Sequence, residues 1–440
     1  TLWCGKSLTP ATASSLPPRI IRFQFNIFQS YILEFGQAPD GRPYMRVIAN
    51  GAYVTETGIP ATGATQANPC VVSAVNSYSN GDWVFANDFA GMTELNGRTF
   101  VVAGANAAAF ALTDLFGNPV SSLGFGAYAG GGTVARIYTN FEPLYALEDL
   151  PYLKLVQSAD VMTLCCVNQR TLTEYPAIDL RRLAANNWQF DVTTFAASIA
   201  APANCTATTT VASTSPALPT QYAYCVTAVD AGTGEESVRS NIAYIADSAD
   251  ISLVAGTHRI RWNAVDGAGS YNVYQAPAGY NTAVPVGSVF AYVGSSFGNE
   301  FINTNILADQ SKTPPLHNNP FARGAVAAAT PVAGGSGYVQ STTTAAMVST
   351  TGTGAVLSPV VVGGAVVAII IENGGEDYVD TDTILITGAG TLANFTPVIG
   401  PQSGTYPSVP NYFQSRRAYA STINNPDTLF LSQTGAYTNM

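Results

Sequence analysis

Residues 19–57 alternate between apolar and polar side chains in two stretches. A period of two is typical of strands that bury one face and expose the other. Pro39-Asp40-Gly41, which follows the second stretch, has the composition of a tight turn. We therefore expect half-buried strands joined by turns. The apolar positions of the alternation are Ile21, Phe23, Phe25, Tyr31, Leu33 and Phe35.

Glycine-containing turns divide residues 58–140 into short runs rich in Val, Phe and Thr. Gly81-Asp82, Asn96-Gly97 and Gly130–Gly132 separate these runs. Asn-Gly is the strongest short hairpin signal, because both residues tolerate the positive φ of a type I′ turn. The pattern predicts a module of hairpins, with a type I′ turn at Asn96-Gly97.

Helix signals are few in this chain. The best short helix candidate is Leu144–Leu150, and a predicted strand follows it through Val161–Val167. Residues 201–320 return to long strand-like runs and end in a Pro-rich exit at Lys312–Pro315. The pattern predicts an all-β protein whose helix is limited to short pieces.

A degenerate repeat marks residues 321–404. "GGSGY" begins at Gly334, and "GGEDY" begins forty residues later at Gly374, after a β-branched run. Such spacing suggests two similar hairpin units stacked on each other. Residues 405–440 then resume an alternation like that of the first fifty residues.

The outline is a scaffold built from the start, middle and end of the chain, with three β modules inserted between its pieces. Long insertions at the loops of a scaffold cost little entropy. The fold class expected is all-β and multi-module: an interrupted scaffold, suspected to be a propeller-like platform, that carries β-sandwich or β-barrel-like domains. The predicted segments are scaffold at 1–57, 141–195 and 405–440, a small β domain at 58–140, a sandwich at 196–320 and a Gly-rich repeat module at 321–404.

Composition agrees with this outline. The chain has 440 residues, of which 10% are charged and 10% aromatic, with 40 Gly and 26 Pro. The longest apolar stretch, Val360–Ile371, is interrupted by Gly363 and Gly364, which argues against a membrane span. The start lacks a secretory pattern and an initiating Met, so we expect a processed or partial product.

Metal and redox chemistry have little support in the sequence. The six Cys include no C-x-x-C pair, and only His258 and His317 are available as further ligands. Cys205 and Cys225 can face each other on neighbouring strands, but buried thiols in a reducing compartment are favoured. The net charge of −10 argues against a nucleic-acid clamp, yet an acidic wall would let DNA slide past without sticking.

Two stretches carry candidate chemistry. "GSSFG" at 294–298 fits the nucleophile-elbow pattern, but a strand is predicted after Ser296 where a helix would be needed, so a plain hairpin turn is favoured. An acidic stretch within 372–382 could bind Ca²⁺ through oxygen ligands, although a solvated acidic loop is favoured. Its carboxylates are Glu372, Glu376, Asp377, Asp380 and Asp382.

Three weaker signals have simpler explanations. "GFGAYAG" at 124–130 is only loosely similar to a dinucleotide fingerprint, and no helix is predicted after it. The sequons at Asn204 and Asn394 need a secretory route. Arg181-Arg182 and Arg416-Arg417 are more typical of surface or interface ion pairs than of a nucleic-acid patch. No catalytic, cofactor-binding or metal-binding residue is therefore expected.

Several stretches resemble a known family in their order along the chain. "IIRFQFNIFQSYILEFG", then "YLKLVQSADVMTL" with "LRRLAANNWQFDVTTF", and finally "FQSRRAYASTINNPDTLFLSQTGAYTNM" resemble the nozzle (tail tubular) proteins of short-tailed bacteriophages. Residues 88–112 are similar to a small β domain of ubiquitin-activating enzymes. "VTAVDAGTGEES" and "RWNAVDGAGSYNVY" resemble fibronectin type III strands in an unusual order, and the Gly-Gly-x-x-Tyr repeats resemble those of phage tail and fibre proteins.

The resemblance implies a structural virion protein rather than an enzyme, with no cofactor. It implies a homo-hexameric ring below the tail adaptor, next to tail fibre or spike proteins, that retains and ejects genomic DNA through its channel without specific binding. Assembly would take place in the host cytoplasm. The alternative is a receptor- or glycan-binding tail protein, in which Tyr280, Tyr292 or Tyr338 stack on sugars. A cell-wall hydrolase is a third possibility, but the sequence offers no carboxylate pair for it.

Overall fold

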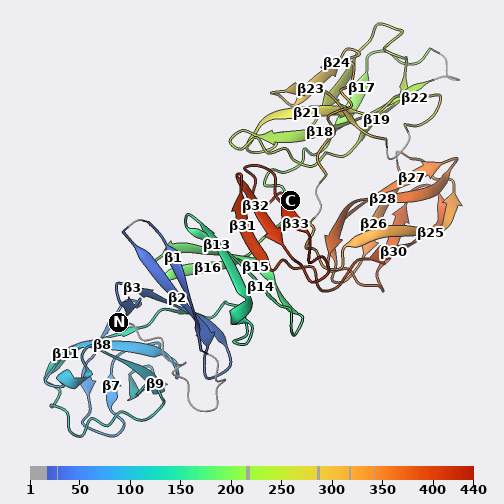
Figure 1. Ribbon diagram of the computed structural model, residues 1–440. Helices are drawn as coiled ribbons and strands as arrows, with labels where there is room; N and C mark the ends of the chain where they lie inside the picture. The colour runs from blue at the N-terminus through green and yellow to red at the C-terminus, as the bar shows by residue number, and fades with distance from the viewer. Residues whose placement is uncertain (1–16, 27, 215–218, 285–287, 317–318, 341) are drawn as a thin grey trace. The chain divides into compact units, whose positions relative to one another are not determined.

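The computed structural model describes residues 17–26, 28–214, 219–284, 288–316, 319–340 and 342–440. It confirms the all-β class: 51% of the chain is strand, arranged in eight separate antiparallel sheets (Figure 1). Within the described ranges there is no α-helix, and neither a propeller nor a barrel is present. Cys4 and His317 lie outside the described residues.

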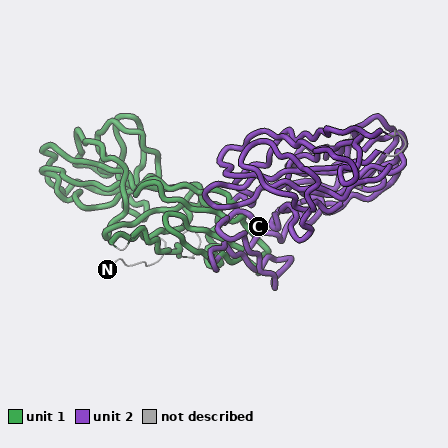
Figure 2. Tube along the Cα trace, turned by 90° about the horizontal axis from the view of Figure 1, so that it is seen from above, with its two compact units in different colours: residues 1–193, 408–410 green, residues 194–407, 411–440 purple. Residues whose placement is uncertain are grey.

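The chain divides into two compact units, coloured separately in Figure 2. Unit 1 comprises Thr1–Thr193 and Ser408–Pro410, and unit 2 comprises Thr194–Pro407 and Asn411–Met440. Each unit contains more than one hydrophobic core.

Two sheets of unit 1 pack around one core. The first has the order β1 (Arg19–Gln24), β2 (Ser30–Gln37), β3 (Pro43–Ala49), β12 (Thr139–Asn140), with β4 (Ala52–Tyr53) paired to β3. The second has the order β13 (Leu153–Ser158), β14 (Val161–Asn168), β15 (Thr173–Ala184), β16 (Asn187–Val192). Their shared core includes Phe23, whose ring lies 4.7 Å from that of Trp188. The alternation in β1, the Pro39-Asp40-Gly41 turn and the strand at Val161–Val167 are confirmed. In β2 the predicted apolar positions are buried, but Glu34 and Gly36 between and beside them are buried too, so this strand is not half-buried as expected.

The predicted helix at Leu144–Leu150 is wrong. Tyr145 and Leu147 enter the core that the two sheets share, whereas Leu144 and Glu148 face solvent. Burial at every second position needs extended backbone, because a helix would turn successive side chains by about 100°. Only a 3₁₀ turn, η2 (Leu150–Tyr152), follows.

A seven-stranded sheet with its own core forms the rest of unit 1. Its order is β5 (Ile59–Pro60), β11 (Gly130–Arg136), β8 (Trp83–Ala90), β9 (Arg98–Asn106), β10 (Ala109–Thr113), β7 (Val71–Ser73), β6 (Gly63–Ala64), with a 3₁₀ turn, η1 (Thr93–Leu95), between β8 and β9. Gly130–Gly132 begin β11 rather than separate two strands. A Cβ added to Gly132 would lie 2.8 Å from the Phe89 ring, so this end of the strand packs closely only because a side chain is absent.

The type I′ turn predicted at Asn96-Gly97 is also wrong. Gly97 has φ 71°, but Asn96 has φ −67° and ψ 139°, which are the angles of a type II turn. The Asn96 side chain accepts a hydrogen bond from the Phe89 backbone N–H at 2.7 Å and donates one to its carbonyl at 3.0 Å. This pairing with the end of β8 keeps Asn96 out of the left-handed region.

In unit 2, two sheets enclose a core of large aromatic and aliphatic side chains. One has the order β17 (Thr206–Thr209), β20 (His258–Arg261), β24 (Glu300–Asn303). The other has the order β19 (Ala243–Ser248), β18 (Thr220–Asp230), β21 (Ala268–Gln275), β23 (Ala291–Ser296), with β22 (Gly279–Tyr280) paired to β18. The two fibronectin-like stretches are neighbours here, because β18 pairs with β21.

The Gly-Gly-x-x-Tyr repeats contribute three strands each. The first repeat supplies β25 (Val326–Ser336), β26 (Thr344–Val348) and β27 (Thr353–Val362), and the second supplies β28 (Ala365–Glu376), β29 (Thr383–Thr387) and β30 (Thr391–Ile399). Two separate stacked hairpins were expected, but the strands pair mainly between repeats: β25 with β30, β26 with β29 and β27 with β28.

The last sheet has the order β31 (Val409–Phe413), β32 (Arg416–Ala420), β33 (Leu429–Leu431). Beside it lies an aromatic cluster in which the ring of Tyr419 is 5.3 Å from that of Phe195 and 5.4 Å from that of Phe321. Phe430 packs on Phe321 at 4.9 Å. Residues from three distant parts of the sequence thus share one contact region in unit 2.

Candidate functional site

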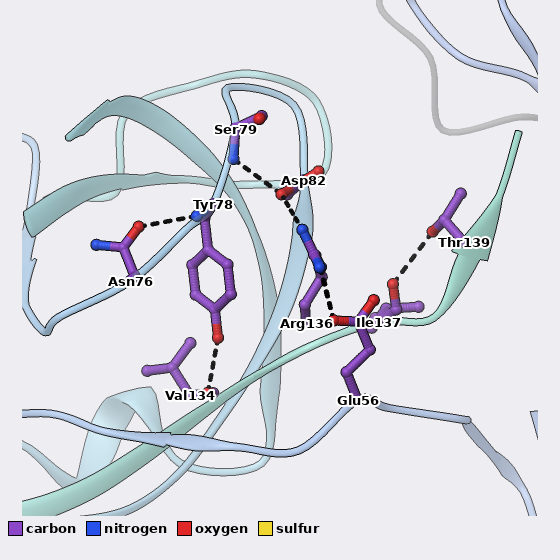
Figure 3. Close-up of polar contacts among 9 residues, drawn as sticks. All are labelled: Glu56, Asn76, Tyr78, Ser79, Asp82, Val134, Arg136, Ile137 and Thr139. Atoms are coloured by element: carbon purple, nitrogen blue, oxygen red, sulfur yellow. Dashed lines mark hydrogen bonds and ion pairs between the residues drawn. The ribbon is translucent and has the colours of Figure 1, made fainter. Parts of the chain in front are cut away.

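A network of polar contacts in unit 1 lies where the seven-stranded module joins the first sheet (Figure 3). The chain leaves that sheet after β4 and returns to it at β12. The outgoing and returning segments pair through the bridge between Thr55 and Ile137. Glu56 donates its backbone N–H to the Arg136 carbonyl at 2.8 Å.

Arg136 is the centre of this contact. Its Nη2 atom lies 2.7 Å from Glu56 Oε2, and its Nη1 atom lies 3.3 Å from Asp82 Oδ2. Asp82 also accepts the backbone N–H of Ser79 at 2.9 Å, so the loop before β8 is held by the same carboxylate. Hydrogen bonding to Glu56 raises the pKa of Arg136 above its usual value. The guanidinium thus connects the start, a loop and the end of the module.

A second arginine, Arg46, is almost fully buried beside this contact. Its guanidinium carbon lies 3.6 Å from the centre of the Trp83 ring and 4.2 Å from that of Tyr44. Its Nη1 atom lies 3.8 Å from Glu34 Oε1, and Glu34 also accepts hydrogen bonds from the hydroxyls of Tyr44 at 2.8 Å and Tyr53 at 2.7 Å. We call Glu34, Tyr44, Arg46, Tyr53 and Trp83 the junction network.

The junction network places charge between two cores. Glu34 and Arg46 are 6% and 5% exposed, and they are direct cross-strand partners in β2 and β3. Burial, with the nearby Glu34 carboxylate, raises the pKa of Tyr53 far above its usual value, so this tyrosine stays a donor. A buried charge without partners costs several kcal/mol, and here each charge has a partner. The charged groups and hydroxyls of the network bind one another, so its chemistry is that of attachment.

An arrangement in unit 2 resembles catalytic machinery. His258 Nδ1 lies 2.7 Å from the Tyr224 hydroxyl, and its Nε2 lies 3.1 Å from Ser248 Oγ. Ser248 donates its own proton to the Ala249 carbonyl at 2.7 Å, so Nε2 carries the ring proton and Nδ1 accepts from Tyr224. Asn303 Nδ2 donates to the Tyr224 hydroxyl at 3.0 Å. We call Asn303, Tyr224, His258 and Ser248 the histidine chain.

The histidine chain is sealed inside the sandwich. Tyr224, Ser248 and His258 are each 0% exposed, and Asn303 is 1% exposed. Burial lowers the pKa of His258 to about 4, so the ring is neutral near pH 7. Ser248 directs its hydrogen away from the imidazole, and no substrate can reach it. The geometry is that of a satisfied polar core.

The "GSSFG" stretch does not form a nucleophile elbow. Ser296 ends β23, and the chain then crosses to β24 in the other sheet of the sandwich. The predicted strand after the motif is confirmed, but the connection joins two sheets and is not a hairpin. Ser296 Oγ donates to the carbonyl of Glu300 at 2.8 Å, so its hydroxyl stabilises the bend.

The carboxylates of the acidic stretch do not gather around a common site. Glu372 pairs with Arg239 at 2.6 Å, and Asp382 accepts the backbone N–H of Val379 at 2.9 Å. Across the described part of the chain, no three His, Cys, Asp or Glu side chains are grouped in a way that would hold a metal ion. The Arg239–Glu372 pair instead links the sandwich to the repeat module within unit 2.

The remaining sequence candidates fall in structural positions. The Gly126 N–H, in the loop similar to a dinucleotide fingerprint, donates to Glu94 at 3.1 Å, and a strand rather than a helix follows. Arg181 forms the expected ion pair, with Asp191 at 3.0 Å. Arg417 does not match the expected surface position, because it is 5% exposed and lies over the ring of Tyr412.

The sequons, the other arginines and the thiols are placed as follows. Asn204 and Asn394 are exposed. Arg182 stacks on Phe25 at 3.9 Å, and Arg416 donates to the Ser432 carbonyl at 2.8 Å. The five described cysteines, Cys70, Cys165, Cys166, Cys205 and Cys225, are buried and form no disulfide with one another.

The three tyrosines proposed for sugar stacking differ in exposure. Tyr280 is 65% exposed, whereas Tyr338 is 6% exposed and lies in the core of the repeat module. Tyr292 is partly buried, and Lys312 Nζ lies 4.1 Å above its ring. Only Tyr280 therefore presents a free aromatic face.

Sequence reasoning missed both the junction network and the histidine chain. The junction network had a weak signal in the sequence. Glu34 and Arg46 are isolated opposite charges in consecutive predicted strands, and the register of a hairpin between these strands places them opposite each other. The histidine chain had no such signal, because its members lie on four different strands and no local pattern shows that their side chains meet.

No known family model matches this chain, and no curated protein matches it. In the described portion of the chain, no helix has the length and hydrophobicity required to cross a bilayer.

Proposed function

We propose that this chain is a structural protein of a short bacteriophage tail, and that copies of it form a ring-shaped nozzle below the adaptor. DNA would be retained in the ring and ejected through it. The proposal rests on the sequence resemblance, in which three nozzle-like stretches occur in the same order as in that family. Its partners would be further copies, the adaptor, tail fibres or spikes, and DNA that passes without specific binding.

One observation carries the proposal beyond the sequence. The first two nozzle-like stretches are separated by more than a hundred residues, yet their strands β1, β2 and β13–β16 build a single core. The seven-stranded module has a separate core, and Arg46 and Arg136 attach it where its chain leaves and rejoins the first sheet. A shared scaffold with attached modules is the organisation that the resemblance implies.

The finer fold assignments also belong to the proposal. Residues 196–320 would be a fibronectin type III-like sandwich, which the pairing of β18 with β21 supports, and residues 58–140 would be the small β domain of the ubiquitin-activating type.

The low charge of the chain supports a role in assembly and passage. Only 18 basic and 28 acidic residues occur among 440, so large parts of its surface are neutral. Neutral strand edges invite pairing with another copy, and closure of a ring would cover them. An excess of ten acids per copy would weaken contact with the DNA backbone.

Negative-stain images of the purified protein test the ring directly. We expect annular particles with a central hole, and particles that stay monomeric at high concentration would contradict the proposal. DNA affinity provides a second measurement: we expect weak binding to double-stranded DNA near physiological salt. Tight binding that falls steeply as salt rises would point to a clamp instead.

A receptor- or glycan-binding tail protein remains the second candidate. The observation that favours it is the 65% exposure of Tyr280, since an exposed aromatic face can stack on a sugar ring. A monomer that loses glycan binding in Tyr280→Ala would support this function over the nozzle.

A further inference from the structure

The two repeats of unit 2 have equivalent corners. Gly335 and Gly375, forty residues apart, have φ of 64° and 62°. A Cβ added to Gly335 would lie 2.2 Å from the Thr391 carbonyl oxygen, and one added to Gly375 would lie 2.2 Å from that of Thr353. Each corner thus packs against the first residue of the third strand of the other repeat, with space only for glycine.

The tyrosines of the two motifs are equivalent as well. Tyr338 and Tyr378 are 6% and 4% exposed. The Tyr338 hydroxyl accepts the backbone N–H of Ala393 at 3.3 Å, and the Tyr378 hydroxyl accepts that of Ala355 at 3.2 Å. The two accepting tyrosines are forty residues apart, and the two donating alanines are thirty-eight residues apart. Residues of one repeat can therefore be matched to equivalent residues of the other.

Strand pairing follows the same correspondence. β25 of the first repeat pairs with β30 of the second, and β28 of the second pairs with β27 of the first. The pair Val326 and Ile399 therefore corresponds to the pair Val366 and Val361. The middle strands β26 and β29 pair with each other. The module is thus built as two copies of one unit that complete each other.

The connection between the repeats is a two-residue turn. Gly363 and Gly364 have φ of 59° and 81°, and Val362 pairs with Ala365 on either side of them. Positive φ at both positions is the geometry of a type I′ turn, which glycine adopts without strain. If this turn were extended, β27 and β28 would become one continuous strand.

We propose that residues 324–400 bind a second copy of this chain by exchanging repeats. When the Gly363-Gly364 turn opens in both copies, the first repeat of each chain pairs with the second repeat of the other. Every pairing between the two repeats of the closed module then has an identical counterpart between chains, whereas the β26–β27 pairing stays within one repeat. The inference rests on the register of β25–β30 and does not depend on the proposed nozzle function.

The balance between closed and exchanged forms depends on concentration. A tight turn holds the two repeats of one chain at an effective concentration in the millimolar range or above, so the closed form dominates in dilute solution. The fraction of the exchanged form rises when copies are held close together, as in any oligomer. Hinge turns of this kind are the usual control point for exchange between protomers.

A cysteine pair in the full chain distinguishes the two forms. Thr330 and Thr396 are exposed and lie directly opposite each other in β25 and β30. In Thr330→Cys/Thr396→Cys, oxidation of the closed form gives a disulfide within one chain, whereas the exchanged form gives a covalent dimer. Arg181→Cys/Gln189→Cys, in the β15–β16 hairpin, is the matched control that links only within a chain.

We expect the fraction of covalent dimer to rise with protein concentration for the Thr330/Thr396 pair and to stay at background for the control. In that cysteine background, Gly363→Val/Gly364→Val disfavours the positive φ of the closed turn and should raise the dimer fraction at fixed concentration by at least about tenfold. Gly363→Asn keeps a favoured type I′ sequence and should leave the fraction at or below that of the parent.

Three results would count against the proposal. One is a dimer fraction that stays at background at every concentration in the parent pair, which remains informative even if the valine variant does not fold. Another is a folded valine variant, shown by an unchanged cooperative unfolding transition, whose disulfide remains within one chain. Dimers that form equally in the Arg181/Gln189 control would also count against exchange, since they would show association elsewhere.

Discussion

The junction network and the histidine chain are both buried and polar, but they differ in charge and in location. The junction network holds an ionised Arg46 and Glu34 between two cores of unit 1. The histidine chain is neutral and lies inside one core of unit 2. The first attaches a module to a scaffold, and the second fills the interior of a sandwich.

The difference shows what each environment supplies. Arg46 has two aromatic faces, a carboxylate and the Thr139 hydroxyl as partners, so its charge is balanced where it is buried. His258 faces only the neutral groups of Tyr224 and Ser248 through its ring nitrogens, and desolvation therefore keeps it unprotonated. Equal burial thus gives a charged contact in one region and a neutral one in the other.

Removing Arg46 should have the largest effect. In Arg46→Met the Glu34 carboxylate stays buried without its cation, so we expect the free energy of unfolding to fall by about 3–5 kcal/mol, measured by urea denaturation. Arg22→Met, at an exposed position of β1, should change it by less than about 0.5 kcal/mol. The double variant Glu34→Gln/Arg46→Met should recover part of the loss, and additive effects would show that the two charges are not coupled.

Acid should act on the histidine chain. The pKa of His258 is about 4 in the folded protein against 6.5 for an unperturbed histidine. The unfolded state therefore binds a proton more readily than the folded state does between these two values. The free energy of unfolding keeps its full value above pH 6.5 and falls by about 3 kcal/mol as the pH drops toward 4. The difference between the wild-type and His258→Phe stability curves isolates this term, and a difference that is constant from pH 7 to pH 4 would contradict it.

The smallest effect is expected at Arg136, which is partly exposed. Its ion pairs with Glu56 and Asp82 have side-chain exposures between 17% and 36%, so Arg136→Gln should cost only about 0.5–1 kcal/mol. Salt should screen the interaction, and the difference from wild type should shrink at about 1 M NaCl. A loss that does not change with salt would mean that packing, and not charge, holds the module at this point.

The sequence predicted those strands and turns whose conformation depends mainly on neighbouring residues. Alternation located β1 and β2, the Pro-Asp-Gly turn ended the second of them, and the Gly-Gly-x-x-Tyr spacing revealed the repeat. These features follow from side-chain periodicity and from the few residues that tolerate a turn. The same signals also indicated an all-β protein.

Long-range contacts reversed other local preferences. Leu144–Leu150 is not helical because Tyr145 and Leu147 must both reach one core, and Asn96 leaves the left-handed region because its side chain pairs with Phe89. Which repeat pairs with which, and which carboxylate meets Arg239 or Arg46, also depended on segments distant in sequence.

By itself, the sequence determined the strand-rich class, the position of many strands and turns, and the existence of two related units near residues 334 and 374. Only the tertiary structure decided which strands are buried on both faces. In β2, for example, Phe35 enters one core and Glu34 on the other face meets Arg46 at the junction. The physical reason is that periodicity is a property of neighbouring residues, whereas burial and charge pairing depend on surfaces that come together only when distant strands pack.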